Sequence, residues 1–591
     1  MSNSKESGKA FDQQLFKRLL QYTRPYQFTF YGVALAAIVL SAFAVLRPVL
    51  VGFLVDEAIK MADAQKLLNL TLILLAVLIG EVCSQLIFNY FSNWLGQSVI
   101  RDIRVKLFHH MTHFKMSYFD NSSIGILVTR AVADMQRIGE IFSQGFFVIV
   151  ADLLKMFVVA GVMLYLNWRL SLIVFAVLPI ILYATRLFQR AMKGAFTEVR
   201  AQVAQLNSFV QERISGMKVV QLFNRAATEK KAFEGINEKH TKAWLKTVWY
   251  NSVFFPVADI VSSITIGMIV WYGGLQNLSG VTADQYSTIF TFILLSEMLF
   301  RPLRQIADKF NTLQMGMVAA ARVFKILDTQ DQTETGGDTH LETIAGNIGF
   351  EEVVFGYLPE APVLKGISFT VSKGETLAIV GATGAGKSTI INLLNRFYNI
   401  QGGAITIDHH NIKDLSLHCL RSHIAIVLQE VFLFADTIEN NISLGHDHIQ
   451  LSQIEAAAKE IGVHDFIMSL PGGYQFNVKE RGSMLSSGQR QLIAFLRAYV
   501  TAPSILVLDE ATSSIDNTSE KLIQKATETI TKGRTSIVIA HRLATVQKAS
   551  NILVMEAGKI VEQGTHEALL KKGGYYKNLY EAQFSGALEA S

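Results

Sequence analysis

Six long apolar stretches in the first half of the chain constrain its fold more than any other feature. Crossing about 30 Å of hydrocarbon as an α-helix takes roughly 20 mostly apolar residues, and each stretch approaches or exceeds that length. A buried helix of a soluble protein could explain one such stretch, but not six in succession. The expected membrane spans are 28–46, 67–95, 141–166, 170–187, 248–272 and 286–310.

Composition supports this interpretation. Hydrophobic residues make up 50% of the 591 residues and charged residues only 17%, against about 25% charged residues in ordinary soluble domains. Intrinsic disorder and an entirely soluble chain are therefore both disfavoured. The net charge of +5 does not require a nucleic acid partner, because membrane proteins carry excess Lys and Arg in their cytoplasmic loops. We expect no nucleic acid partner.

The basic residues between the spans predict the orientation. Lys and Arg are frequent before residue 28, between spans two and three, and between spans four and five, whereas the other connections are short and carry few charges. The positive-inside rule then places both termini and both long connections in the cytoplasm of a multi-pass protein of the cell membrane. Those connections continue the helical pattern, so the helices should project beyond the bilayer to tips near 118–124 and 213–220.

The composition changes after residue 319. Residues 328–340 are polar, and short apolar β-branched strands then alternate with helices, a pattern typical of an α/β domain on a mostly parallel sheet. We therefore predict an α-helical six-span transmembrane domain over 1–325, a linker over 326–346 and an α/β domain over 347–591.

A glycine-rich segment follows the predicted strand 377–380 and precedes a helix expected to begin near Ile390. It matches the G-x-x-x-x-G-K-[ST] phosphate loop of P-loop NTPases, whose backbone N–H groups and helix N-terminus bind phosphate. In such a loop Lys387 reaches the β- and γ-phosphates and the Ser388 hydroxyl can ligate Mg²⁺. The expected ATP-binding residues here are Gly381, Ala382, Thr383, Gly384, Ala385, Gly386, Lys387, Ser388 and Thr389.

A second apolar strand, 504–508, ends in two acids, Asp509 and Glu510. Asp509 can hold Mg²⁺ directly or through water, and Glu510 can polarise the attacking water. Strands often end in acidic residues, so the pair carries weight because a phosphate loop lies upstream.

The segment Leu485-Ser-Ser-Gly-Gln489, 20 residues before Asp509, narrows the class. It resembles the LSGGQ signature of ATP-binding cassette (ABC) proteins, with Ser487 in place of a glycine. Six spans before one cassette resembles an ABC exporter half-transporter over nearly the whole chain. The resemblance implies that Ser486, Gly488 and Gln489 contact the γ-phosphate of ATP held by the opposite subunit's phosphate loop.

The resemblance extends to four further residues in the cassette. It implies that Tyr357 stacks on adenine, that Gln429 senses Mg²⁺ and the attacking water, that Asp516 lies in the loop crossing the cassette dimer, and that His541 contacts the γ-phosphate. The segment 479–482 resembles the family's acidic coupling segment, although Lys479 stands where the family more often has glycine.

The membrane half resembles the family more weakly. Residues 118–120 with Gly125, Arg130 and Asp134 resemble a first coupling region, and Glu212 with Gly216 a second. Several charged residues also fall inside the predicted spans, where charges usually face a partner or a cavity. Asp152 and Lys155 lie on one helical face, so pairing between them and a role in cargo binding are both open. The span charges are Glu81, Asp152, Lys155, Asp259 and Glu297.

Taken together, the resemblance implies an ATP-hydrolysing exporter half that uses Mg²⁺, works as a dimer and alternates access. A homodimer is favoured over a heterodimer, because Glu510 is present and Ser487 removes no backbone N–H. A lipid or an amphiphilic drug is the expected cargo, alongside membrane lipid as a partner. The alternatives are an ATP-gated channel or a regulatory protein that does not pump, with an importer as a third option.

Overall fold

The computed structural model describes residues 12–55, 63–278, 286–333, 336–510, 517–540 and 543–588. The chain divides into two compact units. The helical unit comprises Met1–His113 and Ser122–Gln330, and the α/β unit comprises Phe114–Asn121 and Asp331–Ser591. A short segment from the first half of the chain thus belongs to the α/β unit.

The helical unit is built from long helices. Within the described residues, five are long and apolar enough to cross a membrane: Arg24–Phe53, Ala64–Thr112, Ile124–Leu166, Trp168–Ser215 and Ala226–Leu275. These helices contain the first five predicted spans. The sixth predicted span lies in α11, Tyr286–Leu327, which is long enough but less apolar because Glu297 and Arg301 fall within it. The sixth span therefore stays a prediction.

Besides α11, these runs and the helices beside them consist of the following elements. They are α1 (Gln13–Gln21), α2 (Gln27–Phe53), α3 (Ala64–Thr112), α5 (Ile124–Thr129), α6 (Met135–Glu140), α7 (Phe147–Leu166), α8 (Trp168–Ser215), α9 (Met217–Leu222) and α10 (Ala226–Leu278), with π-helical turns at Arg130–Asp134 and Ile141–Phe146. Side-chain caps start two of the long helices. Asp63 accepts bonds from the backbone of Gln65 and Lys66, and Asn167 caps α8 in the same way.

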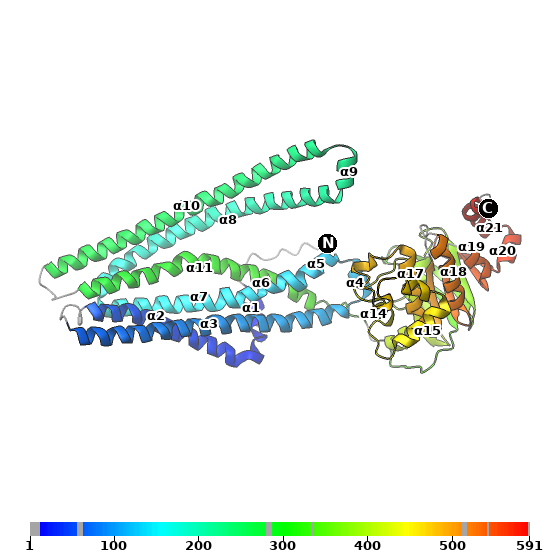
Figure 1. The fold of residues 1–591 in the computed structure, drawn as a ribbon, viewed down its shortest axis with the longest axis horizontal. Coiled ribbons are helices and arrows are strands. Elements are labelled where there is room, and N and C mark those ends of the chain that lie inside the picture. Colours follow the sequence, from blue (N-terminus) through cyan, green and yellow to red (C-terminus); the bar gives the residue numbers. More distant parts are fainter. Residues whose placement is uncertain are drawn as a thin grey trace. The chain divides into compact units, whose positions relative to one another are not determined.

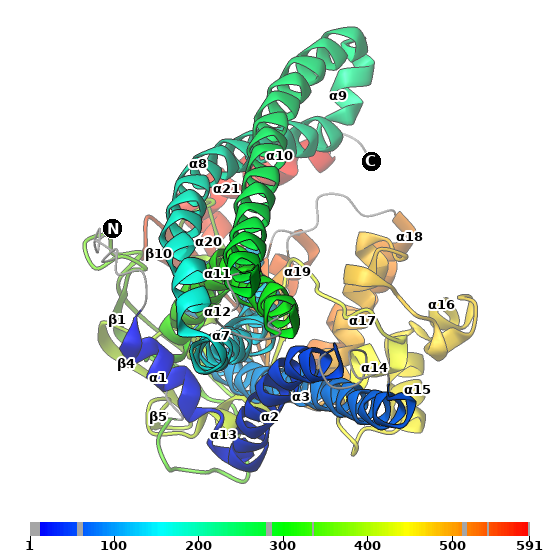
Figure 2. The same ribbon diagram turned by 90° about the vertical axis from the view of Figure 1, so that its left-hand side faces the viewer.

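Helices α8 and α10 run side by side and are joined through α9 at their tip (Figures 1 and 2). Each contains about 50 residues, which at roughly 1.5 Å per residue makes a rod of about 75 Å. The hydrocarbon core accounts for only about 30 Å of that length. Both helices are therefore long enough to project well beyond a bilayer, as the sequence predicted.

Charges inside the predicted spans are paired between helices rather than along them. The Asp152 carboxylate on α7 pairs with the ammonium of Lys309 on α11, and Arg47 on α2 lies 3.7 Å from Glu81 on α3. The ion-pair partner of Asp152 is thus Lys309 rather than Lys155, and the role of Lys155 in binding cargo stays open. Helix α7 packs against α11, so Asp152 reaches across the helix interface. Lys155 forms no ion pair with any described residue.

A buried carboxylate joins two other parts of the helical unit. Asp134 is 3% exposed and accepts hydrogen bonds from Arg130 at 2.7 Å and from Arg322 of α11 at 2.9 Å. A buried carboxylate is stable only when cations offset its charge, and here Arg130 and Arg322 do so together. This contact ties the π-helical turn after α5 to the last helix of the unit.

We predict that Asp134→Ala destabilises the protein by about 2 kcal/mol or more. This is below the roughly 3–5 kcal/mol for breaking a fully buried pair, because Arg322 is partly exposed. Differential scanning fluorimetry of the purified protein in detergent should show a midpoint lowered by about 4 °C or more. Glu198→Ala, which removes an exposed pair with Lys246, should cost about 1 kcal/mol or less. Equal effects of the two substitutions would contradict the importance of Asp134.

The α/β unit contains two sheets. The larger has the order β10-β9-β3-β8-β7-β6, in which only β10 runs antiparallel to its neighbour. Its strands are β3 (Thr376–Gly381), β6 (Ile424–Val427), β7 (Ile505–Glu510), β8 (Thr535–Ala540), β9 (Asn551–Glu556) and β10 (Lys559–Gly564). The mostly parallel sheet expected from the sequence is thus confirmed.

A smaller antiparallel sheet, which the sequence did not predict, has the order β2-β1-β4-β5. Its strands are β1 (Ile348–Phe355), β2 (Leu364–Val371), β4 (Gly402–Ile407) and β5 (His410–Asn411). The described helices of the α/β unit are α4 (Met116–Asp120), α12 (Lys387–Leu394), α13 (Leu417–Ser422), α14 (Ile438–Ser443), α15 (Leu451–Ile461), α16 (His464–Met468), α17 (Ser487–Val500), α18 (Asn517–Thr531), α19 (Leu543–Lys548), α20 (His566–Lys572) and α21 (Tyr575–Leu588).

Both faces of the larger sheet are buried. Leu506 and Leu508 of β7 join a core with helices such as α15 and α17, while Ile505 and Val507 join a second core shared with the smaller sheet. Burial on both faces explains why this strand is a continuous apolar run rather than an alternating one.

Candidate nucleotide-binding site

Three of the predicted site segments follow or end strands of the larger sheet at the same edge. Strands β3, β8, β7 and β6 are parallel neighbours, so their carboxyl ends lie at the same edge. The phosphate loop follows β3, Asp509 and Glu510 end β7, and Gln429 comes two residues after β6. Ligands of open parallel sheets bind beyond this edge. The fold therefore brings together segments that lie far apart in the sequence.

The phosphate loop has a backbone that requires glycine. Gly381, Gly384 and Gly386 have φ angles of 155°, 83° and 100°, a region that L side chains rarely adopt. A Cβ at Gly381 would lie 2.3 Å from the Met555 carbonyl oxygen. Helix α12 begins at Lys387, three residues earlier than expected. The N-terminus of the helix therefore directly follows the loop, as anion binding requires.

Lys387 is folded back over this loop. Its side chain is buried, and its ammonium donates to the carbonyl oxygens of Gly381 at 2.8 Å and Ala382 at 3.0 Å. Burial lowers the pKa of Lys387, and the nearby Asp509 carboxylate opposes that shift. A cation held at the mouth of a glycine loop is placed to meet phosphate oxygens.

Two oxygen ligands suited to Mg²⁺ lie side by side. The Ser388 hydroxyl donates to the Asp509 carboxylate at 3.3 Å. The described residues contain no cluster of three or more His, Cys, Asp or Glu side chains that could hold a metal alone. This combination fits Mg²⁺, which usually takes one or two protein ligands and completes its shell with water and substrate phosphates.

The structure describes the other predicted catalytic residues in part. Glu510 is the last residue of β7, opposite Ala540 of β8. Gln429 is exposed after β6. His541, the next residue after β8, and Asp516 lie outside the described residues, so their roles stay predictions.

Tyr357 lies beside the helix that follows the phosphate loop. Its hydroxyl accepts a hydrogen bond from the Asn392 side chain at 3.1 Å and lies 3.4 Å from the Thr389 hydroxyl. About half of the residue is exposed, which leaves ring surface available for stacking. The sequence predicted Tyr357 but missed its partner Asn392, because a polar residue on a helix carries no signal of its own.

The signature segment starts a helix. Ser486 is the N-cap of α17, its hydroxyl accepts from the Gln489 N–H at 3.2 Å, and the Gln489 side chain accepts from the Ser486 N–H. This reciprocal capping box fixes the helix start. Ser487 is the first helical residue, with negative φ, and Gly488 is buried. Serine therefore replaces glycine here without backbone strain.

Residues 118–120, predicted as part of the first coupling region, belong to the α/β unit. The Tyr398 hydroxyl donates to the Asp120 carboxylate of α4, and the Lys115 N–H donates to the Asp331 carbonyl at 2.9 Å. Burial and the bond to Asp120 both raise the pKa of Tyr398. The rings of Tyr398 and Tyr357 meet edge to face with centroids 5.1 Å apart. No sequence pattern pointed to Tyr398, because its contact spans 278 residues.

The second predicted coupling region forms the turn between α8 and α10. Glu212 pairs with Arg213, which also pairs with Glu229 at 2.5 Å, and Gly216 follows the end of α8. The Arg213 hydrogen bond lowers the pKa of Glu229. These contacts hold α9 at the tip of the helix pair.

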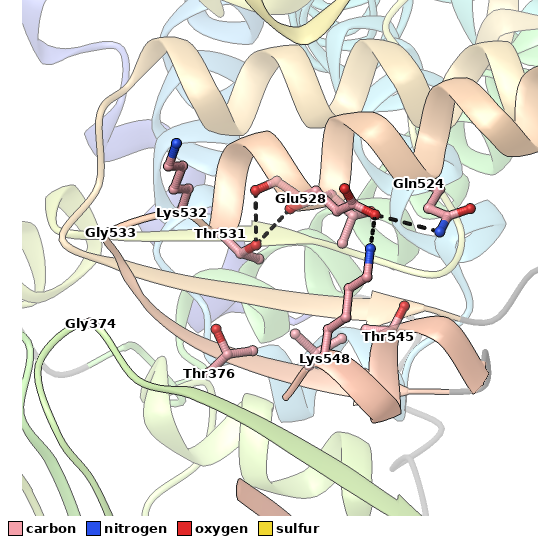
Figure 3. Close-up of a pocket in the computed structure, with 11 residues that line it drawn as sticks. Gly374, Thr376, Gln524, Glu528, Thr531, Lys532, Gly533, Thr545 and Lys548 are labelled. Atoms are coloured by element: carbon pink, nitrogen blue, oxygen red, sulfur yellow. Dashed lines mark hydrogen bonds and ion pairs between the residues drawn. The ribbon is translucent and has the colours of Figure 1, made fainter. Parts of the chain in front are cut away.

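A separate cavity of 360 Å³ in the α/β unit lies at the opposite edge of the sheet (Figure 3). Gly374 and Thr376 line it at the amino end of β3. Glu528 and Lys548 also line it and form an ion pair, with Lys548 Nζ 2.5 Å from Glu528 Oε1. The cavity lies at the amino end of β3, whereas the phosphate loop follows the carboxyl end of the same strand. It is therefore not part of the nucleotide site.

Comparisons with known proteins agree with this arrangement. The model of the ABC transporter transmembrane region matches residues 30–303, and the ABC transporter model matches residues 364–513. An uncharacterized ABC transporter ATP-binding protein of Bacillus subtilis, YknV, is 36% identical over 98% of this chain and 96% of its own length. The chain belongs to the ABC transporter family.

Relatives with a named activity cover the chain equally well. The ATP-dependent lipid A-core flippases of Syntrophus aciditrophicus and Idiomarina loihiensis are 35% and 36% identical over 96% and 97% of this chain, and over 94% and 98% of their own lengths. The family assignment therefore applies to both units of this ABC transporter, which is a multi-pass membrane protein with an ATP-binding domain.

One departure from the family pattern has a structural cost. Lys479, where the family more often has glycine, has φ 60° and ψ −174°, a region occupied almost only by glycine. The following turn, Glu480–Gly482, holds Arg481 at positive φ as well. The transporter therefore carries backbone strain beside the signature segment.

We predict that Lys479→Gly stabilises the transporter by about 1 kcal/mol. Relief of roughly 1–3 kcal/mol of strain outweighs the added unfolded-state entropy of glycine, about 0.5–1 kcal/mol. Denaturant titration of the purified protein should show the gain. Lys479→Ala is the control, because alanine keeps the Cβ and should bring no comparable gain. A stabilisation by alanine equal to that by glycine would contradict this explanation.

Proposed function

We propose that this chain is an ATP-hydrolysing exporter half that works as a dimer, with a transmembrane domain over 1–325, a linker over 326–346 and a nucleotide-binding domain over 347–591. The observation that carries the proposal is the convergence of the phosphate loop with the Asp509–Glu510 pair at one sheet edge, with Ser388 hydrogen-bonded to Asp509. A chain that only bound ATP as a gate would have no need of a hydrolytic base.

Each residue at this edge takes one role in hydrolysis. The loop N–H groups and Lys387 bind the phosphates, and Tyr357 stacks on adenine. Glu510 accepts a proton from water as the water oxygen bonds to the γ-phosphorus and the bond to the bridging oxygen breaks. The residues proposed to position the water and contact the γ-phosphate are Gln429 and His541.

Ser388 and Asp509, with Gln429, are the residues that would hold Mg²⁺. When bound, the ion neutralises charge on the phosphate oxygens. Burial lowers the pKa of Lys387, and a bound phosphate would compensate the charge of the buried ammonium.

The signature completes the site of a second chain. Ser486, Gly488 and Gln489 stand at the N-terminus of the 14-residue helix α17, where N–H groups and the helix dipole favour an anion. We propose that they contact the γ-phosphate held by the partner, with Asp516 in the loop that crosses between cassettes. The strain-free backbone at Ser487 supports two active sites in a homodimer, with a heterodimer as the alternative.

Motion of the nucleotide-binding domain reaches the membrane through α4. This helix belongs to the α/β unit, is held there by Tyr398, and is continuous in sequence with α3 and α5. Closure of two cassettes around ATP would therefore displace the ends of both membrane helices. ATP binding to the closed state shifts the equilibrium between inward- and outward-facing forms.

We propose a lipid or amphiphilic small molecule as the cargo, with both termini in the cytoplasm of a cell membrane. The lipid A-core flippases among the relatives support a lipid. The basic connections support the orientation. Directional, ATP-dependent movement of a fluorescent phospholipid in sealed proteoliposomes tests export against an ATP-gated channel.

We predict that Glu510→Gln lowers ATP turnover by roughly 10²–10⁴-fold, the usual contribution of a general base, while ATP binding stays close to wild type. Phosphate release and binding of a fluorescent ATP analogue measure the two quantities. Lys387→Ala should instead weaken binding itself. Glu556→Gln, which changes an exposed acid at the end of β9, is the matched control and should keep normal turnover. Hydrolysis at the wild-type rate in Glu510→Gln would refute the proposed role.

We also predict that the chain purified alone forms a dimer and hydrolyses ATP, and that Ser487→Gly changes its rate only a few-fold. The reason is that Ser487 has helical backbone and removes no N–H donor. Light scattering of the detergent-solubilised protein and an ATPase assay test both parts. A chain that stays monomeric or inactive until a second half-transporter is supplied would favour the heterodimer.

A further inference from the structure

Two histidines lie one turn apart at the end of helix α3. His109 is in the last turn of the helix, which ends at Thr112, and His113 is the C-cap residue. Both residues are exposed, and the centroids of their rings are 4.5 Å apart. Residues four positions apart face the same side of a helix, and this is the spacing at which two histidines bind one zinc ion in the H-E-x-x-H motif. The pair therefore has the spacing of a metal chelate.

A hydrogen bond of His113 leaves its other ring nitrogen ready for a metal. The Nδ1 of His113 lies 2.7 Å from the carbonyl oxygen of His109, which also accepts a bond from the Thr112 hydroxyl at 2.8 Å. A carbonyl oxygen only accepts hydrogen bonds, so Nδ1 carries the proton and the neutral ring has its lone pair on Nε2. Histidines that bind metals commonly donate their second N–H to a backbone carbonyl, which fixes the tautomer and the ring orientation. The His113 ring is held in this way.

The distance between the two rings suits one shared ion. Zn²⁺ binds imidazole nitrogens at about 2.0–2.1 Å in tetrahedral geometry, which places the centroids of two bound rings roughly 5 Å apart. The rings of His109 and His113 are 4.5 Å apart and tilted by 53°. Small rotations of two exposed side chains would therefore bring both nitrogens to one ion, whose remaining positions would be filled by water.

The end of the helix also suits a cation. The last carbonyl groups of a helix carry partial negative charge, which favours positive charge within the final turn. Lys106 lies three residues before His109, and its ammonium is directed to Tyr22, 3.4 Å from the hydroxyl and 5.5 Å from the ring centroid. This nearby cation is thus held by a partner of its own.

Other histidines of the described chain lack this combination of features. His110 is half-buried, and its Nε2 donates to the Thr329 carbonyl at 3.0 Å. It also lies about 100° around the helix from His109. His446 and His448 have rings 5.3 Å apart, but they are two positions apart in a loop, and no hydrogen bond to a described residue fixes either ring.

We propose that His109 and His113 bind one divalent transition-metal ion through one ring nitrogen each, which is Nε2 in His113. Imidazole ligands suit Zn²⁺, Cu²⁺ and Ni²⁺. The bound ion closes a clip across the last turn of α3. His113 is the residue at which the chain leaves the helical unit, because Phe114 belongs to the α/β unit. The metal thus stabilises the helix end at the boundary between the two units.

The test measures Zn²⁺ binding to the untagged full-length protein in detergent, because a polyhistidine tag would bind the same ions. Competition with a chromophoric chelator gives the affinity. His109→Gln and His113→Gln should each weaken binding by about tenfold or more, since two linked ligands bind far more tightly than either alone. His110→Gln is the matched control, because glutamine can keep the bond to Thr329 while the pair stays intact. Its affinity should equal that of wild type.

Cu²⁺ gives a spectroscopic readout that reports the ligands directly. With one Cu²⁺ per chain, pulsed electron paramagnetic resonance should detect two bound imidazoles in wild type and one in His109→Gln or His113→Gln. His446→Gln, which breaks up the pair in the loop, should keep both.

Three outcomes would overturn the site. They are equal Zn²⁺ affinity in wild type and the two variants, a signal from two imidazoles that persists in both variants, and a loss of binding in His110→Gln or His446→Gln equal to theirs. None of these measurements requires ATP hydrolysis or transport, so their result is independent of the proposed function.

Discussion

The parallel register of β3, β8, β7 and β6 is the constraint on which the nucleotide site depends. Each strand is buried on both faces, so its polar and charged residues are confined to its ends. Parallel pairing then puts all carboxyl ends on one side. The phosphate loop after β3 and the acids ending β7 come together because Asp509 pairs in register with Ile539, while Ile379 of β3 pairs with the same residue from the other side.

The helical unit is governed by a different constraint. Backbone polar groups in hydrocarbon must bond within their own helix, so a helix that enters the membrane cannot end there. Helix α3 runs unbroken for 49 residues and reaches the segment that joins the α/β unit. The requirement that makes a stable span thus also gives a helix that extends well beyond the length needed to cross the hydrocarbon.

Local patterns predicted the features that depend on local physics. The first five spans follow from apolar length, and the phosphate loop follows from the glycines that its backbone angles require. Contacts between distant segments could not be predicted. Asp152 pairs with Lys309, 157 residues away, and Tyr398 with Asp120. The antiparallel sheet was missed for the same reason, because β1 pairs with both β2 and β4 and no short-range pattern encodes that choice.

Two departures from the family pattern look alike in the sequence but differ in physical meaning. Ser487 and Lys479 both replace a glycine that the family favours. Ser487 is the first residue of α17, with helical backbone angles that any residue adopts. Lys479 has a backbone conformation that glycine alone adopts without strain. Glycine is needed for its conformation only where φ is positive. The Ser487 change therefore leaves the N–H groups at the start of α17 in place, whereas the Lys479 change stores strain in the turn before the helix. A degenerate site therefore cannot be inferred from the loss of a glycine alone, and the backbone at Ser487 favours a competent one.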